Sequence, residues 1–412
     1  PALEKALINS IDFIKTRNSD QYFRMAVDRV FTIQGKGVVV TGTIFSGCLN
    51  RSDYLTVSSN GSEVRVRGIR VYKKDVERVE AGERCALNLV GRRFSVSSIR
   101  RGAWLTHRNL YIPTARIDVE LYVLKTENHA LKHWTPVHFY IGADHSSARV
   151  AILSSSNIAP GDKGLAQIVL PRDTFAVSGD HFVLRDQSAK RTLAGGRVLD
   201  PHAPKRGRRK GTRVAKLLAM GGENHHHILK VLVDRSKSGI SFHWFSTTFN
   251  VSENRINEIA TSLDFMKIGK SPKNWIYSSQ NWIELLKLIE SCVNFFHQVK
   301  PTLLGPTTEA IHLSLKIFLD RTILELALNM LVLERKLFLK DNRFYLPSHN
   351  VDVSKCHQAL LKTLLNILEP ESGGPPSPSQ IANKLGLEVK VIEKTLKIGI
   401  HLGDILKIGK GR

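Results

Sequence analysis

The sequence predicts a multidomain protein in which two antiparallel β-barrels are followed by tandem α/β winged-helix domains. From Tyr22 to about Asp200 the chain consists of short β-rich runs separated by Gly, Asp, Asn and Pro, which is typical of antiparallel barrels. After about residue 205 a helix-rich pattern repeats roughly every 70 residues. A chain of 412 residues is also long enough for several small domains.

Composition and charge indicate a globular protein with a polyanionic partner. Hydrophobic residues make up 42% of the chain and charged residues 24%, which excludes a disordered chain. The formal net charge of +23 favours nucleic acid as the partner, although a solvated basic surface is the alternative. We expect no membrane association, because neither a spanning apolar run, a signal peptide nor a basic amphipathic helix with a bulky apolar face is present.

The cysteines predict neither a metal site nor a disulfide framework. Four cysteines lie far apart without a Cys-x-x-Cys pair, at positions Cys48, Cys85, Cys292 and Cys356. We therefore expect free thiols in a reducing, cytoplasmic environment.

The elements of the β-rich half divide into two predicted barrels. A short amphipathic helix is expected over residues 2–16, where apolar side chains recur at helical spacing. Residues 19–109 and 110–204 are the two predicted barrels, with a break near 108–113. Alternating runs such as 63–67 and 115–121 supply the strands.

A basic run follows the second barrel. It crowds cations into twelve residues without an acidic one, and its candidate RNA-backbone residues are Lys205, Arg206, Arg208, Arg209, Lys210 and Arg213. A solvated linker and a hinge that grips a phosphate backbone both fit this composition, so the two interpretations stay open.

Three winged-helix domains are predicted over residues 205–278, 279–349 and 350–412. In the second, helices are expected over 282–296, 308–318 and 320–334, and a hairpin over 337–347 with Asp341-Asn342 at its tip. In the third, helices are expected over 356–368, 379–385 and 389–402, with a loop over 369–376. Winged helices grip nucleic acid or serve as protein-interaction spacers, and each remains possible for any single domain.

The first barrel resembles the second domain of translational GTPases. Residues 23–31 (Phe-Arg-Met-Ala-Val-Asp-Arg-Val-Phe), running into 35–43 (Gly-Lys-Gly-Val-Val-Val-Thr-Gly-Thr), carry this resemblance, and residues 46–53, 63–69 and 81–89 are similar to later parts of that domain. In the superfamily this barrel receives the aminoacyl end of tRNA.

The family within that superfamily is indicated by other segments. Residues 195–204 (Gly-Gly-Arg-Val-Leu-Asp-Pro-His-Ala-Pro) resemble the SelB family of bacterial selenocysteine-specific elongation factors. The same resemblance is carried by the succession of winged helices, by Phe296-His297 and by residues 346–349. The resemblance implies selenocysteinyl-tRNA, the mRNA selenocysteine-insertion hairpin and the ribosome as partners, selenocysteine incorporation at UGA as the function, and a monomeric state.

The chain departs from the family pattern in two ways. It contains neither a phosphate-binding Gly-x-x-x-x-Gly-Lys-Ser/Thr loop nor an Asn-Lys-x-Asp sequence, so we expect the GTPase domain, with its GTP and magnesium, to be missing and residues 1–18 to be its exit helix and linker. Three winged helices are counted where the family has four. We therefore expect truncation at both ends and no cofactor in this chain, although the parent factor would be a GTPase.

By resemblance, the pocket for the selenocysteine side chain maps onto Asp28, Arg29 and Arg84. A selenol is mostly anionic at neutral pH while the hydroxyl of serine is neutral, so fixed arginines distinguish them better than size does. Arg29 and Arg84 would supply charge, and Asp28 would orient one of them. The alternative is a surface ion pair on a barrel rim, with little energetic value.

Other candidate sites are weaker. His225-His226-His227 invites a metal site, but consecutive helical residues point in different directions, which favours an exposed helix start. Asp144-His145 and Asp180-His181 lack a nucleophile in context, so a hydrolase is disfavoured. A DNA-binding regulator with tandem winged helices remains the alternative function, against which the barrels argue.

Overall fold

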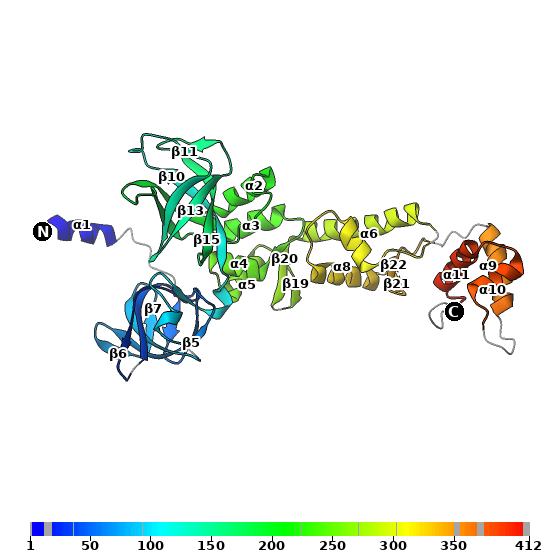
Figure 1. The fold of residues 1–412 in the computed structure, drawn as a ribbon, viewed down its shortest axis with the longest axis horizontal. Coiled ribbons are helices and arrows are strands. Elements are labelled where there is room, and N and C mark those ends of the chain that lie inside the picture. The colour runs from blue at the N-terminus through cyan, green and yellow to red at the C-terminus, as the bar shows by residue number, and fades with distance from the viewer. Residues whose placement is uncertain are drawn as a thin grey trace. The chain divides into compact units, whose positions relative to one another are not determined.

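The computed structural model describes residues 2–11, 19–35, 37–92, 94–222, 224–270, 272–301, 303–349, 355–368 and 375–406. The chain divides into two compact units, one of residues 1–235 with 240–266, the other of residues 236–239 with 267–412. Helix α1 (Ala2–Ile11) opens the first unit (Figure 1). The remainder of the predicted first helix, and residues 369–374 of the predicted loop, lie outside the described residues.

The first barrel is a closed ring of six strands. Its order is β4-β9-β1-β2-β8-β5, and pairing of β4 with β5 closes the ring. The ring strands are β1 (Arg24–Ile33), β2 (Gly37–Ser46), β4 (Tyr54–Val57), β5 (Glu63–Val71), β8 (Arg84–Val90) and β9 (Trp104–Thr106). The short strands are β3 (Cys48–Asn50), β6 (Lys74–Val76) and β7 (Arg78–Glu80), and two 3₁₀ turns cover Val96–Ser98 and Arg108–Leu110.

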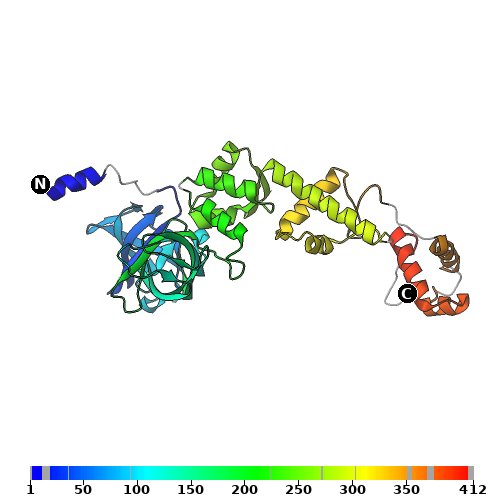
Figure 2. The same ribbon diagram turned by 90° about the horizontal axis from the view of Figure 1, so that it is seen from above.

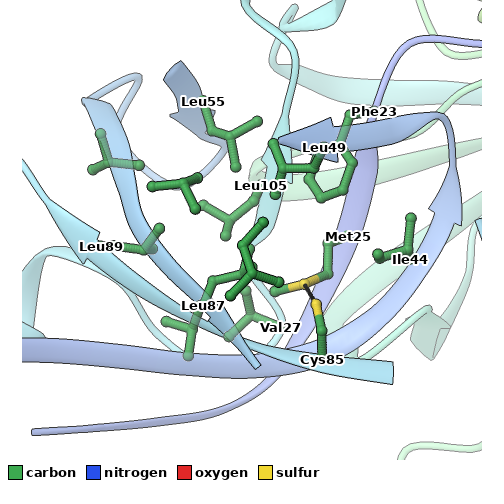
Figure 3. Close-up of a cluster of buried hydrophobic side chains, with 14 of the residues drawn as sticks. Phe23, Met25, Val27, Ile44, Leu49, Leu55, Cys85, Leu87, Leu89 and Leu105 are labelled. Atoms are coloured by element: carbon green, nitrogen blue, oxygen red, sulfur yellow. Dashed lines mark hydrogen bonds between the residues drawn. The ribbon is translucent and has the colours of Figure 1, made fainter. Parts of the chain in front are cut away.

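Alternating apolar residues fill the interior of this barrel. Met25 and Val27 point into it from β1, and Leu87 and Leu89 from β8 (Figure 3). Cys85 joins them, with its Sγ atom 3.7 Å from the Sδ atom of Met25. Burial raises the pKa of the Cys85 thiol to about 12, so this cysteine stays protonated and behaves as a small apolar side chain.

The second barrel is also closed, in the order β10-β15-β13-β12-β16-β17. Its strands are β10 (Thr114–Val123), β12 (Thr135–Ile141), β13 (Asp144–Ile152), β15 (Lys163–Thr174), β16 (His181–Arg185) and β17 (Thr192–Asp200), with β11 (Leu131–Lys132) and β14 (Asn157–Ile158) forming a separate pair. Each pairing in the ring is antiparallel. The prediction of two antiparallel barrels is therefore confirmed.

A buried polar junction joins the two barrels to the first helical region. Arg24 on β1 donates from Nη1 to both carboxylate oxygens of Asp180, at 3.0 and 2.8 Å, and from Nε to Ser46 Oγ at 3.2 Å. Asn250 donates to the same Ser46 Oγ and exchanges hydrogen bonds with the backbone of Tyr22. The Arg24 and Asp180 side chains are only 7% and 9% exposed, so the ion pair is shielded from water.

Helices dominate the rest of the chain, which confirms the helical C-terminal region. The first helical region contains α2 (Gly211–Met220), α3 (His225–Arg235), α4 (Phe242–Phe249) and α5 (Glu253–Ser262), with strands β18 (Ile240–Ser241), β19 (Met266–Lys270) and β20 (Lys273–Tyr277). Ser241 and Ser252 cap the N-termini of α4 and α5 by accepting backbone hydrogen bonds.

The second and third helical regions follow in the second unit. The long helix α6 (Ser279–Val299), seen side-on in Figure 2, precedes α7 (Thr308–Ser314), α8 (Arg321–Leu333), β21 (Phe338–Lys340) and β22 (Arg343–Tyr345). The predicted hairpin tip is present, since Asp341 and Asn342 both adopt left-handed φ values, 51° and 56°. The third region contains α9 (Lys355–Leu368), α10 (Pro378–Leu385) and α11 (Val389–Leu402), with left-handed Gly386 ending α10.

Two stacked histidines close the second helical region. The rings of His297 on α6 and His349 lie 3.7 Å apart and parallel, and their Nε2 atoms lie 3.2 and 3.0 Å from the carbonyl oxygens of Leu304 and Leu303. Burial, with the neighbouring His349, lowers the pKa of His297 to about 4.

Among the described residues, no helix is long and apolar enough to cross a membrane.

We predict that Asp180→Asn destabilises the first unit by about 3 kcal/mol, because it leaves the Arg24 charge buried without an anionic partner. Arg24→Met combined with Asp180→Asn should recover most of this loss, since no uncompensated charge remains. Urea denaturation of both variants measures the difference, and equal destabilisation of the single and double variants would contradict the junction's role.

We predict that acidification destabilises the second helical region. The pKa of folded His297 lies below its usual value of about 6.5, so the unfolded state binds more protons between pH ~6.5 and ~4. Stability is therefore retained above this window and falls by less than about 1.4 kcal/mol per pH unit within it. Hydrogen exchange of α6 amides, corrected for intrinsic rates, measures the slope. His297→Gln keeps a donor for Leu304 and should flatten it; an unchanged slope in that variant refutes the assignment.

Candidate functional site

Asp28 occupies a β-bulge on the first barrel. Val27 pairs with Gly42 and Arg29 pairs with Thr41, so Asp28 is the extra residue on β1. A bulge changes the direction of the side chain it carries. The strands are packed closely here, because a Cβ atom at Gly42 would lie 2.1 Å from the carbonyl oxygen of Ala26. Only glycine therefore fits beside the bulge.

The bulge brings Asp28 to Arg84 across an intervening strand. Arg84 begins β8 and pairs with Thr43 of β2, and β2 lies between β8 and β1. The Arg84 guanidinium donates from Nη1 to Oδ2 of Asp28 at 2.7 Å and from Nη2 to Oδ1 at 3.1 Å. This two-point geometry fixes the plane of the guanidinium as well as its position.

Thr41 completes the arrangement. Its hydroxyl donates to Oδ1 of Asp28 at 2.6 Å, so the carboxylate accepts hydrogen bonds from two neighbouring strands. The Arg84 side chain is 50% exposed and that of Asp28 31% exposed. A pair this exposed contributes at most about 1 kcal/mol to stability. The arrangement therefore serves to hold an oriented cation at the surface, with the remaining guanidinium N–H groups available to a ligand.

Arg29 lies beside this pair but does not join it. It follows Asp28 on β1, pairs with Thr41 in the strand register and is exposed. Within the described residues it has no carboxylate partner. The structure thus brings together Asp28 and Arg84 of the predicted pocket, leaves Arg29 adjacent, and adds Thr41. Strand alternation in the run 38–43 would have placed Thr41 on the outer face, but the bulge that aims Asp28 at it leaves no signal in the sequence.

The residues of the basic run after the second barrel differ in whether they contact that barrel. Lys205, Arg206 and Lys210 are exposed, as the predicted RNA-backbone role requires. Arg208 lies over the ring of Trp134, 5.6 Å from its centroid, and Arg209 donates from Nε to the carbonyl oxygen of Ile152 at 3.1 Å. Part of the run is therefore fixed on the second barrel and is not a free linker.

Arg213 departs from the prediction. Its side chain is 11% exposed and its guanidinium pairs with two buried carboxylates, Asp118 and Asp200. Gln167 also donates to Asp118, at 2.9 Å. With both anions already bound to it, Arg213 is not available for an RNA phosphate. It anchors α2 on the second barrel instead. This role could not be predicted from local sequence, because the partner Asp118 lies far from Arg213 along the chain.

The remaining candidates have structural roles. Asp180 is committed to Arg24, and Asp144 is committed to Arg100 and Arg172. The ring of His225 packs edge-on against Phe245 and Phe249, and burial lowers its pKa, so the histidine run is only partly the exposed helix start that was predicted. The described residues contain no group of three or more His, Cys, Asp or Glu side chains arranged to hold a metal ion.

Known proteins share both barrels and the overall order of the chain. Residues 37–106 match the family model of elongation factor Tu domain 2, and residues 115–205 match that of the beta-barrel domain of selenocysteine-specific elongation factor. A crystal structure of a bacterial selenocysteine-specific elongation factor, EF-Sec, superposes with a TM-score of 0.63 at 20% identity, covering 98% of this chain and 71% of that one.

Curated relatives match along nearly the whole chain. The selenocysteine-specific elongation factors of Haemophilus influenzae and Desulfomicrobium baculatum are 26% identical over 392 and 410 residues, covering 95% and 97% of this chain and 61% and 63% of theirs. That of Escherichia coli K12 is 27% identical over 399 residues, covering 96% and 61%. The chain thus spans about three fifths of the length of these relatives.

The two barrels have the fold found in translation elongation factors. Within that class, the chain is similar along nearly its whole length to selenocysteine-specific elongation factors, and its second barrel matches the beta-barrel domain of that family.

Proposed function

We propose that this chain binds selenocysteinyl-tRNA through its barrels and that Arg84, oriented by Asp28 and Thr41, selects the selenocysteine side chain. The observation that carries the proposal is the Asp28–Arg84 pair, a half-exposed guanidinium fixed by two hydrogen bonds. Similarity along nearly the whole chain to selenocysteine-specific elongation factors supports the choice of ligand.

The physical basis of selection would be charge. Seryl-tRNA differs from the cognate ligand by a single chalcogen atom, and a difference of that size in a pocket is worth only about 1–3 kcal/mol. A selenolate, in contrast, accepts charge-assisted hydrogen bonds from a guanidinium, which are roughly twice as strong as neutral ones. Asp28 cancels part of the Arg84 charge but leaves its outward N–H groups, and Arg29 adds a second cation beside them.

The helical regions would contact partners other than the aminoacyl end of the tRNA. We propose that they extend toward the mRNA selenocysteine-insertion hairpin and the ribosome, which is supported by their winged-helix-like order of helices and hairpins and by the net charge of +23. GTP and magnesium would be bound by a GTPase domain whose motifs these 412 residues do not contain. Comparing duplex DNA with acylated tRNA over a salt series tests the alternative of a DNA-binding regulator.

We predict that Arg84→Ala reduces the preference for selenocysteinyl- over seryl-tRNA by at least about tenfold, because a charge-assisted hydrogen bond worth ~1.5–3 kcal/mol is lost. Competition binding with the two acylated tRNAs measures the ratio of dissociation constants. Arg78→Ala is the matched control: Arg78 is similarly exposed on the same barrel and pairs with Glu80. A preference that is unchanged in Arg84→Ala, or reduced equally in the control, would refute the assignment.

A further inference from the structure

A tryptophan in an unusual backbone conformation lies at one end of the second barrel. Trp134, in the loop between β11 and β12, has φ of 70° and a side chain that is 40% exposed. A bulky residue seldom adopts this left-handed conformation, because its Cβ atom crowds the backbone. The conformation is held by hydrogen bonds on both sides, from Trp134 N to the carbonyl oxygen of Val150 at 2.7 Å and from Arg149 Nη1 to the carbonyl oxygen of Trp134 at 3.4 Å.

The basic run packs against this tryptophan. The Arg208 guanidinium lies over the indole ring, 5.6 Å from its centroid. Arg209 reaches the same end of the barrel, because its Nη2 atom lies 3.1 Å from Nδ1 of His133 and its Nε donates to the carbonyl oxygen of Ile152. His133 and Arg209 are 76 residues apart in the sequence, so two distant segments of the chain form one surface here.

The charge of this surface is unbalanced. We call it the Trp134 patch; its cations are Arg149, Arg208 and Arg209, which contact Trp134 or His133, and Lys132, Lys205, Arg206 and Lys210, which lie close to these residues in the sequence. In the part of the chain that the structure describes, none of these side chains forms an ion pair with a carboxylate, whereas Arg51, Arg70, Arg78 and Arg84 of the first barrel all do. The two arginines nearest His133 also lower its pKa, after desolvation.

We propose that the Trp134 patch is a second RNA-binding site, which takes an unpaired nucleotide by stacking its base on the Trp134–Arg208 pair and holding its phosphates with the surrounding cations. A base stacks on an aromatic face regardless of its identity, and arginine extends such a stack. Uncompensated cations around the ring favour the phosphodiester backbone over an uncharged ligand. The choice of RNA as the ligand rests on the proposed function. The stacking geometry rests only on the observed contact between Arg208 and Trp134.

The test uses the full chain and two fluorescent RNA probes, an unmodified tRNA transcript and an RNA hairpin with an unpaired loop, each compared with a fully paired RNA duplex. Trp134→Gly removes the ring and suits the left-handed backbone, so the barrel should remain folded. We expect at least fivefold weaker binding to a probe with unpaired bases and no change for the duplex, since stacking carries this part of the affinity. The probe that responds identifies whether tRNA or a messenger-like hairpin is the source.

Charge and base contributions are separated by further measurements. Arg206→Gln with Arg208→Gln should reduce the slope of log affinity against log salt by about 1.4, or ~0.7 for each phosphate contact to a single strand. An abasic oligomer of the same length should bind wild type and Trp134→Gly equally. Tyr72→Gly is the matched control, because Tyr72 is 92% exposed, left-handed and adjacent to Lys73, yet lies on the first barrel.

Unchanged affinity of Trp134→Gly for both probes, equal loss on the duplex, or equal loss in Tyr72→Gly would overturn the proposal. These results are independent of the Arg84 experiment. Loss of selenocysteine preference in Arg84→Ala with intact stacking at Trp134 supports both sites, while intact stacking without such a preference would refute the proposed function alone.

Discussion

The buried ion pair between Arg24 and Asp180 is the interaction on which the arrangement of the first unit depends. Removing two charges from water costs several kcal/mol each, so such a pair contributes little net stability and instead favours one geometry in which both partners are satisfied. Ser46 Oγ accepts hydrogen bonds from both Arg24 and Asn250, which brings the first helical region into the same network. Arg24 therefore joins the two barrels, and Ser46 links this pair to the helical region.

The junction also positions the candidate site. Arg24 and Asp28 lie four residues apart on β1, so the junction holds the beginning of the strand while the bulge turns Asp28 toward Arg84. Thr41 and the close approach at Gly42 fix the bulge from the neighbouring strand. A guanidinium on a barrel surface is ordinarily mobile; here its plane is set by a carboxylate whose own position is set by backbone pairing. This preorganisation is what the selection of a charged side chain requires.

Two groups of basic residues in this protein differ in their physical roles. Arg24 and Arg213 are buried, paired with carboxylates and used to join domains. The cations of the Trp134 patch are left without carboxylate partners among the described residues, so their charge is available to a polyanion. The net charge of +23 alone cannot distinguish these groups, because a sequence count treats a buried Arg213 and an exposed Lys205 alike.

Local sequence patterns predicted the strands, helices and turns, but they did not predict contacts between residues that are distant in the sequence. Strand alternation and turn residues predicted the barrels, and the Asp341-Asn342 tip was predicted from its turn chemistry. Arg213 was assigned to RNA because its acidic partners, Asp118 and Asp200, come from another part of the chain. The bulge at Asp28 and the left-handed Trp134 depend on strand register, which a single sequence does not specify. The Asp28–Arg84 site itself came from family resemblance and not from spacing.

In the proposed function, charge rather than size selects the aminoacyl group. The most direct measurement is the ratio of affinities for selenocysteinyl- and seryl-tRNA as the pH is lowered through the pKa of the selenol, with Arg84→Ala measured alongside. The preference of the wild-type chain should fall as the selenolate is protonated, while that of Arg84→Ala stays low throughout. A strong preference that does not change with pH would show that selection depends on size or shape, and would contradict the role assigned to Arg84.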